Sequence, residues 1–181
     1  MKVSREQVAE NRQRILDAAA RLFRERGFDG VTVAEIMKAA ELTHGAFYGH
    51  FRSKEELIAQ TCGHVLGAGS GSEAPPALKD YAAAYLSPRH RDDVGGGCLF
   101  VGLGSEAVRA SPDVRHTLTD AIRRKVEALS RTAPGKTAEA RRRAAIGSWA
   151  AMVGAVLLAR LADDEALADE LLAETRAWLG A

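Results

Sequence analysis

The chain has 181 residues, of which 46% are hydrophobic and 27% are charged, with a formal net charge of +1. This balance is typical of a globular protein with one or two small domains and excludes a disordered or fibrous chain. A net charge near zero also excludes a domain-wide positive field, so any surface for nucleic acid must come from local placement of basic groups. Few aromatic residues and only five prolines favour an all-α fold.

Cysteine content and hydropathy lead us to expect a reduced, cytoplasmic protein. Cys62 and Cys98 are too few for a disulfide scaffold, and the chain shows no signal-peptide pattern at its start. The longest uncharged stretch, residues 144–159, is shorter than the roughly 20 residues that a membrane-spanning helix needs. We interpret this stretch as a buried core helix.

The first third of the chain holds several helix signals in close succession. Apolar residues at helical spacing predict a long first helix over residues 8–26. Two capping boxes of the form Ser/Thr-x-x-Glu, at residues 32–35 and 53–56, predict the starts of a second and a fourth helix. Between them, Thr43 is the candidate cap of a short third helix that runs to residue 50.

A stretch rich in Gly, Ser and Pro, residues 67–77, is the expected domain boundary. It separates an N-terminal domain, residues 1–66, from a C-terminal domain, residues 67–181. In the second domain the apolar spacing predicts five helices, over about residues 78–86, 99–110, 112–132, 137–162 and 164–179.

Two short helices joined by a tight turn and braced by a longer helix have the geometry of a helix-turn-helix, here over about residues 31–50. The second helix of such a unit enters the DNA major groove. Thr32, Thr43 and the Ser53-Lys54 pair lie at helix starts, where unpaired N–H groups and the helix dipole favour phosphate. Gly45 removes a side chain where backbone would have to approach DNA closely.

A longer signature covers the same region. It reads Thr43-x-Gly45-x-Phe47-Tyr48-x-His50-Phe51-x-Ser53-Lys54-Glu55-x-Leu57, preceded by Thr32-Val33-x-x-Ile36-x-x-x-Ala40. At these positions the chain resembles the TetR/AcrR-type transcriptional regulators, from about Arg12 to Leu57. The resemblance implies an all-helical homodimer with an N-terminal three-helix DNA-binding domain and a C-terminal domain that binds a small effector. Such proteins are usually repressors that a ligand releases from their operator.

The resemblance also implies roles for single residues. The positions that usually meet the DNA backbone hold Thr32, Thr43, Tyr48 and Lys54. The positions where bases are approached hold His44, Gly45 and Phe47. Two polar side chains nearby, His50 and Arg52, complete the set of candidate DNA-binding residues. The same comparison assigns the core of the small domain to Ile36, Leu42, Phe51, Leu57 and, in part, Phe47. Taken alone, the three aromatic residues Phe47, Tyr48 and Phe51 are better explained as core residues than as DNA contacts.

Glu41 departs from the family pattern, which most often has Gly at this position of the turn. A non-Gly residue held at positive φ costs about 1 kcal/mol. A carboxylate near DNA would also repel phosphate. We therefore expect a slightly different turn here.

The last two predicted helices are candidates for a dimer interface. Small residues let another helix approach the segment 144–162, and the final helix is amphipathic with an acidic outer face. Helices over about residues 137–162 and 164–179 of two subunits would form a four-helix interface. An intramolecular core is the alternative. Twofold symmetry would require a roughly palindromic operator.

A pocket for the effector is expected between the C-terminal helices. Its candidate lining residues are Tyr81, Tyr85, Cys98, Phe100, Glu106, His116, Trp149 and Met152, all of which are equally explained by packing. Cys98 follows three glycines and begins a predicted helix, where unpaired N–H groups lower the pKa of a thiol. Our hypothesis is that it senses an electrophile or an oxidant, since a similar Gly-Cys-Leu sequence occurs in some family members that respond in this way. The alternative is a small apolar residue at a helix start.

Other function classes have less support. The sequence has no phosphate loop, nucleophile elbow or paired carboxylates, so we expect no enzyme and no cofactor. Cys62 and His64 are two positions apart and face different directions on a helix, which argues against a zinc site. A helical interaction module without DNA binding remains a third class, and it would show no salt-dependent DNA affinity. The operator and the effector are left open.

Overall fold

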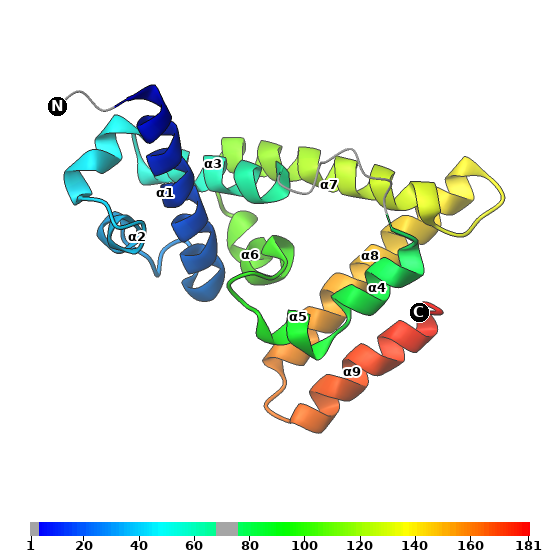
Figure 1. The fold of residues 1–181 in the computed structure, drawn as a ribbon. Helices are drawn as coiled ribbons and strands as arrows, with labels where there is room; N and C mark the ends of the chain where they lie inside the picture. The colour runs from blue at the N-terminus through cyan, green and yellow to red at the C-terminus, as the bar shows by residue number, and fades with distance from the viewer. Residues whose placement is uncertain (1–3, 68–75) are drawn as a thin grey trace. The chain divides into compact units, whose positions relative to one another are not determined.

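The computed structural model describes residues 4–67 and 76–181, and within these ranges the chain forms helices without any strand. The all-α prediction is therefore confirmed. The elements are α1 (Arg5–Arg26), α2 (Val33–Ala39), the 3-10 helix η1 (His44–Gly49), α3 (Lys54–Gly67), α4 (Leu78–Tyr85), α5 (Pro88–Asp92), α6 (Leu99–Ala107), α7 (Pro112–Thr132), α8 (Ala138–Leu161) and α9 (Glu165–Trp178) (Figure 1).

Four elements differ from the sequence-based expectation. α1 starts at Arg5 with Ser4 as its cap, three residues earlier than expected. The third helix is a 3-10 helix, which fits its six-residue length and the two helix-weakening glycines at positions 45 and 49. The prediction missed α5, a five-residue helix without apolar periodicity that starts with Ser87 as its cap and Pro88 in its first turn. α6 ends at Ala107, three residues earlier than expected.

The chain divides into two compact units, and the division falls within helices. The first unit holds α1, α2, η1, α3 and residues 103–119, and the second holds the remaining described residues. α6 therefore begins in the second unit and ends in the first, and α7 does the reverse. Most of the expected boundary stretch, residues 68–75, lies outside the described residues.

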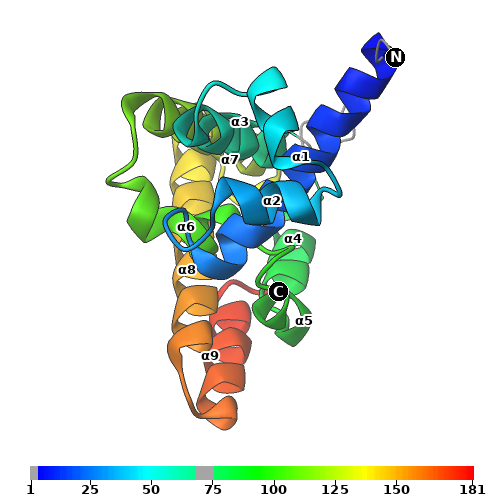
Figure 2. The ribbon, with the colours of Figure 1, turned by 90° about the vertical axis from the view of Figure 1, so that its left-hand side faces the viewer.

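The first unit is built around α1, which packs against both α2 and α3 (Figure 2). Its apolar face contributes Ile15, Ala19 and Phe23, each fully buried. Ile36 from α2 and Leu57 from α3 are also fully buried. This three-helix core holds the short segment that contains η1.

The second unit is organised along α8, against which α4, α5 and α9 pack (Figure 1). By length and composition alone, α8 is the one helix in the described part of the chain that could cross a membrane, a test that the core helix of a soluble protein also passes. Seven of its residues are buried, among them Trp149 and Met152. These buried positions agree with the interpretation of residues 144–159 as a core helix.

Candidate functional site

α2 and η1 form the two short helices of the predicted helix-turn-helix, and they are in contact with each other. Phe47 anchors η1 through a ring that is 1% exposed and stacks on Phe51, with ring centroids 5.7 Å apart. Met37 of α2 is fully buried in the same unit. An aromatic anchor of this kind fixes η1 although its glycines weaken it as a helix.

The turn between these helices is closed by backbone hydrogen bonds. The Leu42 N–H donates to Met37 O at 2.9 Å, and the Glu41 N–H donates to Lys38 O at 3.0 Å. Glu41 has a φ of 56°, the only positive φ of a non-Gly residue in the described ranges. Glu41 itself therefore adopts the left-handed conformation at the position where the family most often has Gly, and its φ gives no sign of the slightly different turn that we expected. Leu42, an expected core residue, is half-buried.

The outer face of η1 carries several of the candidate DNA-binding residues. Thr43, His44 and Gly45 are exposed, and Tyr48 is 69% exposed. The His44 and Tyr48 rings meet edge to face, with centroids 6.4 Å apart. A Cβ added to Gly45 would have no atom of the described residues within 4 Å, apart from its chain neighbours. Internal packing thus gives no reason for a glycine here.

Phe47 lies apart from this face, although it belongs to the same candidate set. Its side chain points into the core of the first unit and is almost fully buried. The Phe47 ring meets the Tyr48 ring edge to face at a centroid distance of 5.3 Å. In this conformation Phe47 supports the exposed Tyr48 from beneath and has no surface to offer to a base.

The predicted capping box at the start of α2 is complete. Thr32 Oγ1 accepts from the Glu35 N–H at 3.2 Å, and Glu35 Oε2 accepts from the Thr32 N–H at 2.8 Å. The Thr32 hydroxyl also donates to Glu35 Oε2, and Arg26 donates to Glu35 Oε1 at 2.9 Å. The hydrogen bonds from Thr32, with that from Arg26, lower the pKa of Glu35 to about 2. The Thr32 hydroxyl is therefore already engaged.

The second predicted capping box is only half formed. The Glu56 N–H donates to Ser53 Oγ at 3.1 Å, as expected. The Glu56 carboxylate, however, accepts from the N–H of Arg52 at 2.7 Å, one residue before the cap. It thereby ties the loop that leads into α3. Arg52 is exposed and Lys54 is half-buried in the first turn of α3.

His50 is half-buried at the end of η1. Burial lowers its pKa, and the charge of Arg12 lowers it further. The Arg12 guanidinium lies over the Phe51 ring at 4.7 Å from the centroid and also hydrogen-bonds Gln60. Arg12 thus braces α1 against α3 behind the candidate DNA-binding face.

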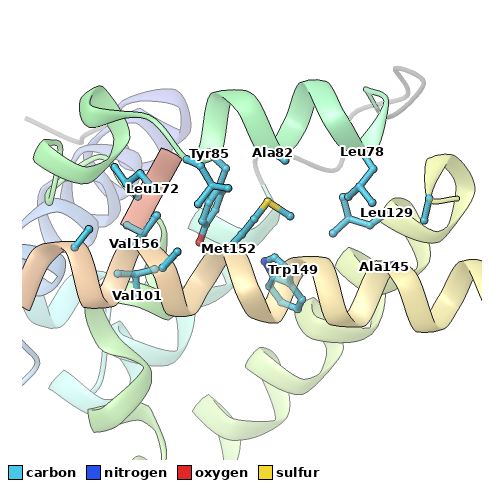
Figure 3. Packing of buried hydrophobic residues seen from close by; sticks show 14 of the residues in the cluster. Leu78, Ala82, Tyr85, Val101, Leu129, Ala145, Trp149, Met152, Val156 and Leu172 are labelled. Carbon is cyan, nitrogen blue, oxygen red and sulfur yellow. The ribbon is translucent and has the colours of Figure 1, made fainter. Parts of the chain in front are cut away.

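Six of the eight candidate effector residues, all except Glu106 and His116, lie in the second unit. Tyr85 of α4 reaches toward α8, where Met152 and Trp149 lie (Figure 3). Tyr81 and Cys98 are half-buried against the same core. The Tyr85 hydroxyl and the Trp149 indole nitrogen are both buried without a hydrogen-bond partner of normal geometry among the described residues.

Glu106 and His116 belong instead to the first unit. The Glu106 carboxylate accepts from the backbone N–H of Phe28 at 2.6 Å, and His116 is exposed. Phe100 packs on the core of the second unit, edge to face with Trp149 at 5.3 Å.

Cys98 precedes α6 directly, and its carbonyl accepts from the Gly102 N–H at 3.1 Å, as expected for a residue at a helix start. Its own N–H donates to His90 Nε2 at 3.1 Å. Burial, and after it the charge and hydrogen bonding of Cys98, raises the pKa of the Tyr85 hydroxyl. Burial lowers the pKa of Lys125, an effect that Cys98 partly offsets. Cys98 therefore lies among polar groups rather than in a purely apolar shell.

Sequence reasoning missed three of the polar residues around Cys98: His90, Lys125 and Arg160. Arg160 of α8 donates to the carbonyls of Arg91 and His90 at 2.8 and 2.9 Å and so holds the end of α5. The Lys125 ammonium lies 4.5 Å from the centroid of the Tyr81 ring. The Ser87-Pro88 cap signal could have revealed α5, but no local pattern indicates which α8 side chain meets it.

Two surface hollows lie in the second unit. A cleft of about 340 Å³ between α4 and α5 is lined by Tyr81, Ala84, Tyr85, Ser87, Arg89, His90 and Asp93. A groove of about 490 Å³ along α8 and α9 is lined by Ala151, Gly154, Ala155, Leu158, Leu171, Glu174, Thr175 and Trp178. The described residues contain no cluster of three or more groups that could hold a metal ion.

Two family patterns match the sequence. Residues 15–61 match the family described as bacterial regulatory proteins, tetR family, and residues 74–174 match the family described as tetracyclin repressor-like, C-terminal domain. The second match alone covers more than half of the chain.

Curated relatives carry the names of transcriptional regulators and repressors. The repressor DhaR of Mycobacterium sp. (strain GP1) is 31% identical over 122 residues, which cover 62% of this chain and 56% of DhaR. The repressor NemR of Escherichia coli (strain K12) is 29% identical over 132 residues, which cover 67% of this chain and 66% of NemR. The regulator AcrR of Shigella flexneri is 42% identical over 57 residues, 32% of this chain and 26% of AcrR. The matched part thus spans less than two thirds of each relative.

Solved structures show the same fold. The reduced form of E. coli NemR superposes with a TM-score of 0.75 at 24% identity, covering 93% of this chain and 95% of NemR. A TetR family regulator from Agrobacterium tumefaciens gives 0.73 at 19% identity, covering 93% of this chain and 97% of that protein. At these identities the similarity concerns the fold.

Proposed function

Since the chain belongs to the TetR family of bacterial regulatory proteins, we propose that it is a cytoplasmic repressor that binds a specific operator through α2 and η1. The observation that carries this proposal is the outer face of η1. There the exposed His44 and Tyr48 flank Gly45, whose missing side chain has no explanation within the protein. A surface that leaves room for a close backbone approach suits the floor of a major groove.

Residues of the candidate set have different roles in this proposal. His44, Gly45 and Tyr48 face the bases or the adjacent backbone, and Thr43, Arg52 and Lys54 hold phosphates at helix starts. Thr32 contributes mainly its place at the start of α2, because its hydroxyl is engaged by Glu35. His50 lies at the edge of the face, and Phe47 acts from the core by fixing η1.

The proposed active species is a homodimer formed through α8 and α9. Exposed apolar side chains gather on these two helices: Ile146, Leu157, Leu158, Leu161, Leu167 and Trp178. Large exposed apolar patches on soluble proteins usually mark interaction sites. Cβ atoms added to Gly147 and Gly154 would have no atom of the described residues within 4 Å, apart from the backbone of α8 itself, so α8 has space for a close helix contact.

The proposed effector site lies in the core of the second unit around Tyr85, Cys98, Trp149 and Met152. The Trp149 N–H is buried without a hydrogen-bond partner among the described residues, and the Tyr85 hydroxyl has only Cys98 beside it. These two groups support a ligand with a hydrogen-bond acceptor, because buried polar groups are normally satisfied. Cys98 would respond to an electrophile by forming a sulfur–carbon bond as its thiol loses the proton, or to an oxidant by oxidation of the sulfur. Electrophile sensing is supported by the polar surroundings of Cys98, which include Lys125 and His90.

Selection of bound sequences from random duplex DNA tests the DNA-binding proposal. We expect an enriched, roughly palindromic sequence whose affinity falls steeply with salt. Absence of any enrichment by folded protein at moderate salt would contradict a sequence-specific regulator. Alkylation of Cys98 to completion with N-ethylmaleimide then tests sensing, with a Cys98→Ser variant as the control. Unchanged operator affinity of the fully alkylated protein would end the sensor hypothesis.

A further inference from the structure

Glu106, at the C-terminal end of α6, reaches the connection between α1 and α2. Its Oε2 accepts a hydrogen bond from the backbone N–H of Phe28 at 2.6 Å, across 78 positions of sequence. Both residues belong to the first compact unit. A hydrogen bond from a backbone N–H to a carboxylate is charge-assisted and about twice as strong as a neutral one.

The backbone around this hydrogen bond is shaped to admit the carboxylate. Gly27 has a φ of 80°, a conformation that side chains rarely adopt. A Cβ at this position would lie 2.3 Å from Glu106 Oε1, which is too close for any real contact. A residue larger than glycine at position 27 would therefore displace the Glu106 side chain.

Phe28 is held from its other side as well. Its ring is buried and meets the Phe23 ring of α1 edge to face, with centroids 5.4 Å apart. The carboxylate of Glu106 fixes the backbone of the same residue. Phe28 begins the short connection that ends at the Thr32 cap of α2. The direction in which the chain leaves α1 toward the helix-turn-helix is set at this point.

We propose that Glu106 is a positioning residue for DNA binding, which acts through the Phe28 N–H to hold α2 and η1 in the orientation that fits an operator. The inference rests on the proposed function, because DNA binding is its readout. Glu106 is not part of the candidate DNA-binding face, so its effect is indirect. α6 begins directly after Cys98 along the chain and ends at Ala107, next to Glu106.

The first test compares Glu106→Ala and Glu106→Gln with the wild-type protein on the selected operator. We expect Glu106→Ala to weaken operator binding by at least about tenfold, since hydrogen bonds to charged groups are worth that much. The salt dependence of binding stays unchanged, because no phosphate contact is lost. Glu106→Gln restores most of the affinity, since its amide oxygen still accepts from Phe28. Glu127→Ala, an exposed change on α7, is the matched control.

A second readout separates positioning from a general loss of stability. Hydrogen exchange of the Phe28 amide should accelerate in Glu106→Ala while amides in the middle of α1 keep their protection. Gly27→Ala should also weaken operator binding, and by a smaller factor in the Glu106→Ala background, where the overlapping carboxylate is absent. This second variant keeps the test decisive if Glu106→Ala alone folds poorly.

Three outcomes would overturn the inference, and they are distinguishable. If wild-type protein binds no operator, the proposed function fails and the inference fails with it. If wild-type protein and Glu106→Ala bind an operator equally and protect the Phe28 amide equally, the inference fails alone. Uniformly faster exchange throughout the first unit, without rescue by Glu106→Gln, would assign Glu106 a purely structural role.

Discussion

Arg14 of α1 and Glu41 in the turn before η1 form an ion pair, with Arg14 Nη2 donating to Glu41 Oε2 at 2.8 Å. Glu41 is the residue that adopts a φ of 56°, so its backbone is strained while its side chain makes a stabilising contact with Arg14. The pair also neutralises an acidic group near the candidate DNA-binding face. Because both side chains are largely solvent-exposed, the attraction itself contributes little to stability.

Replacing Glu41 with Gly is expected to raise the free energy of unfolding by about 0.5 kcal/mol. Relief of roughly 1 kcal/mol of strain outweighs an exposed ion pair and the greater freedom of glycine in the unfolded chain. Urea denaturation followed by circular dichroism measures the change. Glu41→Gln, which keeps the strain and loses the ion pair, should be slightly less stable than wild type. A Glu41→Gly protein no more stable than Glu41→Gln would show that the turn is unstrained.

Gly45→Ala should separate folding from DNA binding. The added methyl group meets open space, and alanine is a better helix former by up to about 1 kcal/mol, so stability should rise or stay unchanged. Operator affinity should fall by about tenfold if the backbone approaches DNA at this point. Thermal denaturation and fluorescence anisotropy measure the two quantities. Gly67→Ala, at the end of α3 and also facing open space, is the control. Equal affinities for the two variants would remove Gly45 from the interface.

Lys54→Ala should weaken binding to every DNA sequence by a similar factor. A lysine that holds a phosphate at a helix start contributes charge without reading bases, and its loss should lower the salt slope of log affinity by about 1. Titrations at several salt concentrations measure this slope. Lys79→Ala, exposed on α4, should leave it unchanged. An altered sequence preference for Lys54→Ala would mean that Lys54 reads bases instead.

The sequence predicted the first unit well because its signals are local. Capping residues, helical spacing and the signature around Phe47 and Phe51 lie within a few positions of the structures they specify. Glu106 shows the limit of this reasoning. It looked like a polar group in an effector pocket, whereas its partner Phe28 lies 78 positions away and is a backbone N–H, which leaves no side-chain pattern to detect.

The second unit was harder to predict for the same physical reason. Helix positions followed from periodicity, but α5 is five residues long and has no apolar period. It is held by long-range hydrogen bonds from Arg160 to the carbonyls of His90 and Arg91. The polar surroundings of Cys98 depend on these contacts. Sequence alone therefore suggested Cys98 as a sensor without indicating its neighbours.

His90 should make the stability of the second unit dependent on pH. Its Nδ1 lies 2.7 Å from Tyr85 O and its Nε2 accepts from the Cys98 N–H at 3.1 Å, an arrangement that requires a neutral ring. Burial lowers the pKa of His90, and Arg160 lowers it further, whereas the hydrogen bond to Tyr85 and the charge of Asp93 oppose the shift. The stabilisation is complete above the unfolded-state value of 6.5 and is lost as pH falls from there through the lower folded-state value.

Urea unfolding between pH 5 and pH 8 measures this dependence. The wild-type protein should lose stability below pH 6.5 relative to a His90→Asn variant, which cannot titrate in this range. If the free energy of unfolding depended on pH in the same way in both proteins, His90 would not be the cause of the pH dependence. The Cys98 N–H lies at the start of α6 and loses its acceptor when His90 is protonated. Hydrogen exchange at the start of α6 should therefore accelerate as the pH falls.

The groove between α8 and α9 gives the sharpest test of the proposed dimer. Trp178 is 74% exposed at the end of α9 and borders a groove that the small residues Ala151 and Gly154 keep open. A partner that covers this surface would bury the indole, and truncating a buried aromatic anchor typically costs 2 kcal/mol or more of binding energy. Trp178→Ala should therefore raise the dimer dissociation constant by roughly thirtyfold or more.

Sedimentation velocity at several protein concentrations measures the dissociation constant, with Val108→Ala as a control for loss of an exposed apolar side chain in the first unit. Gly154→Leu, which fills the groove from its own side, should weaken the dimer in the same way. Operator binding by both variants should then become steeper in protein concentration, because two half-sites are occupied together only after assembly. A wild-type protein that is monomeric at micromolar concentration, or a Trp178→Ala protein as dimeric as wild type, would place the interface elsewhere.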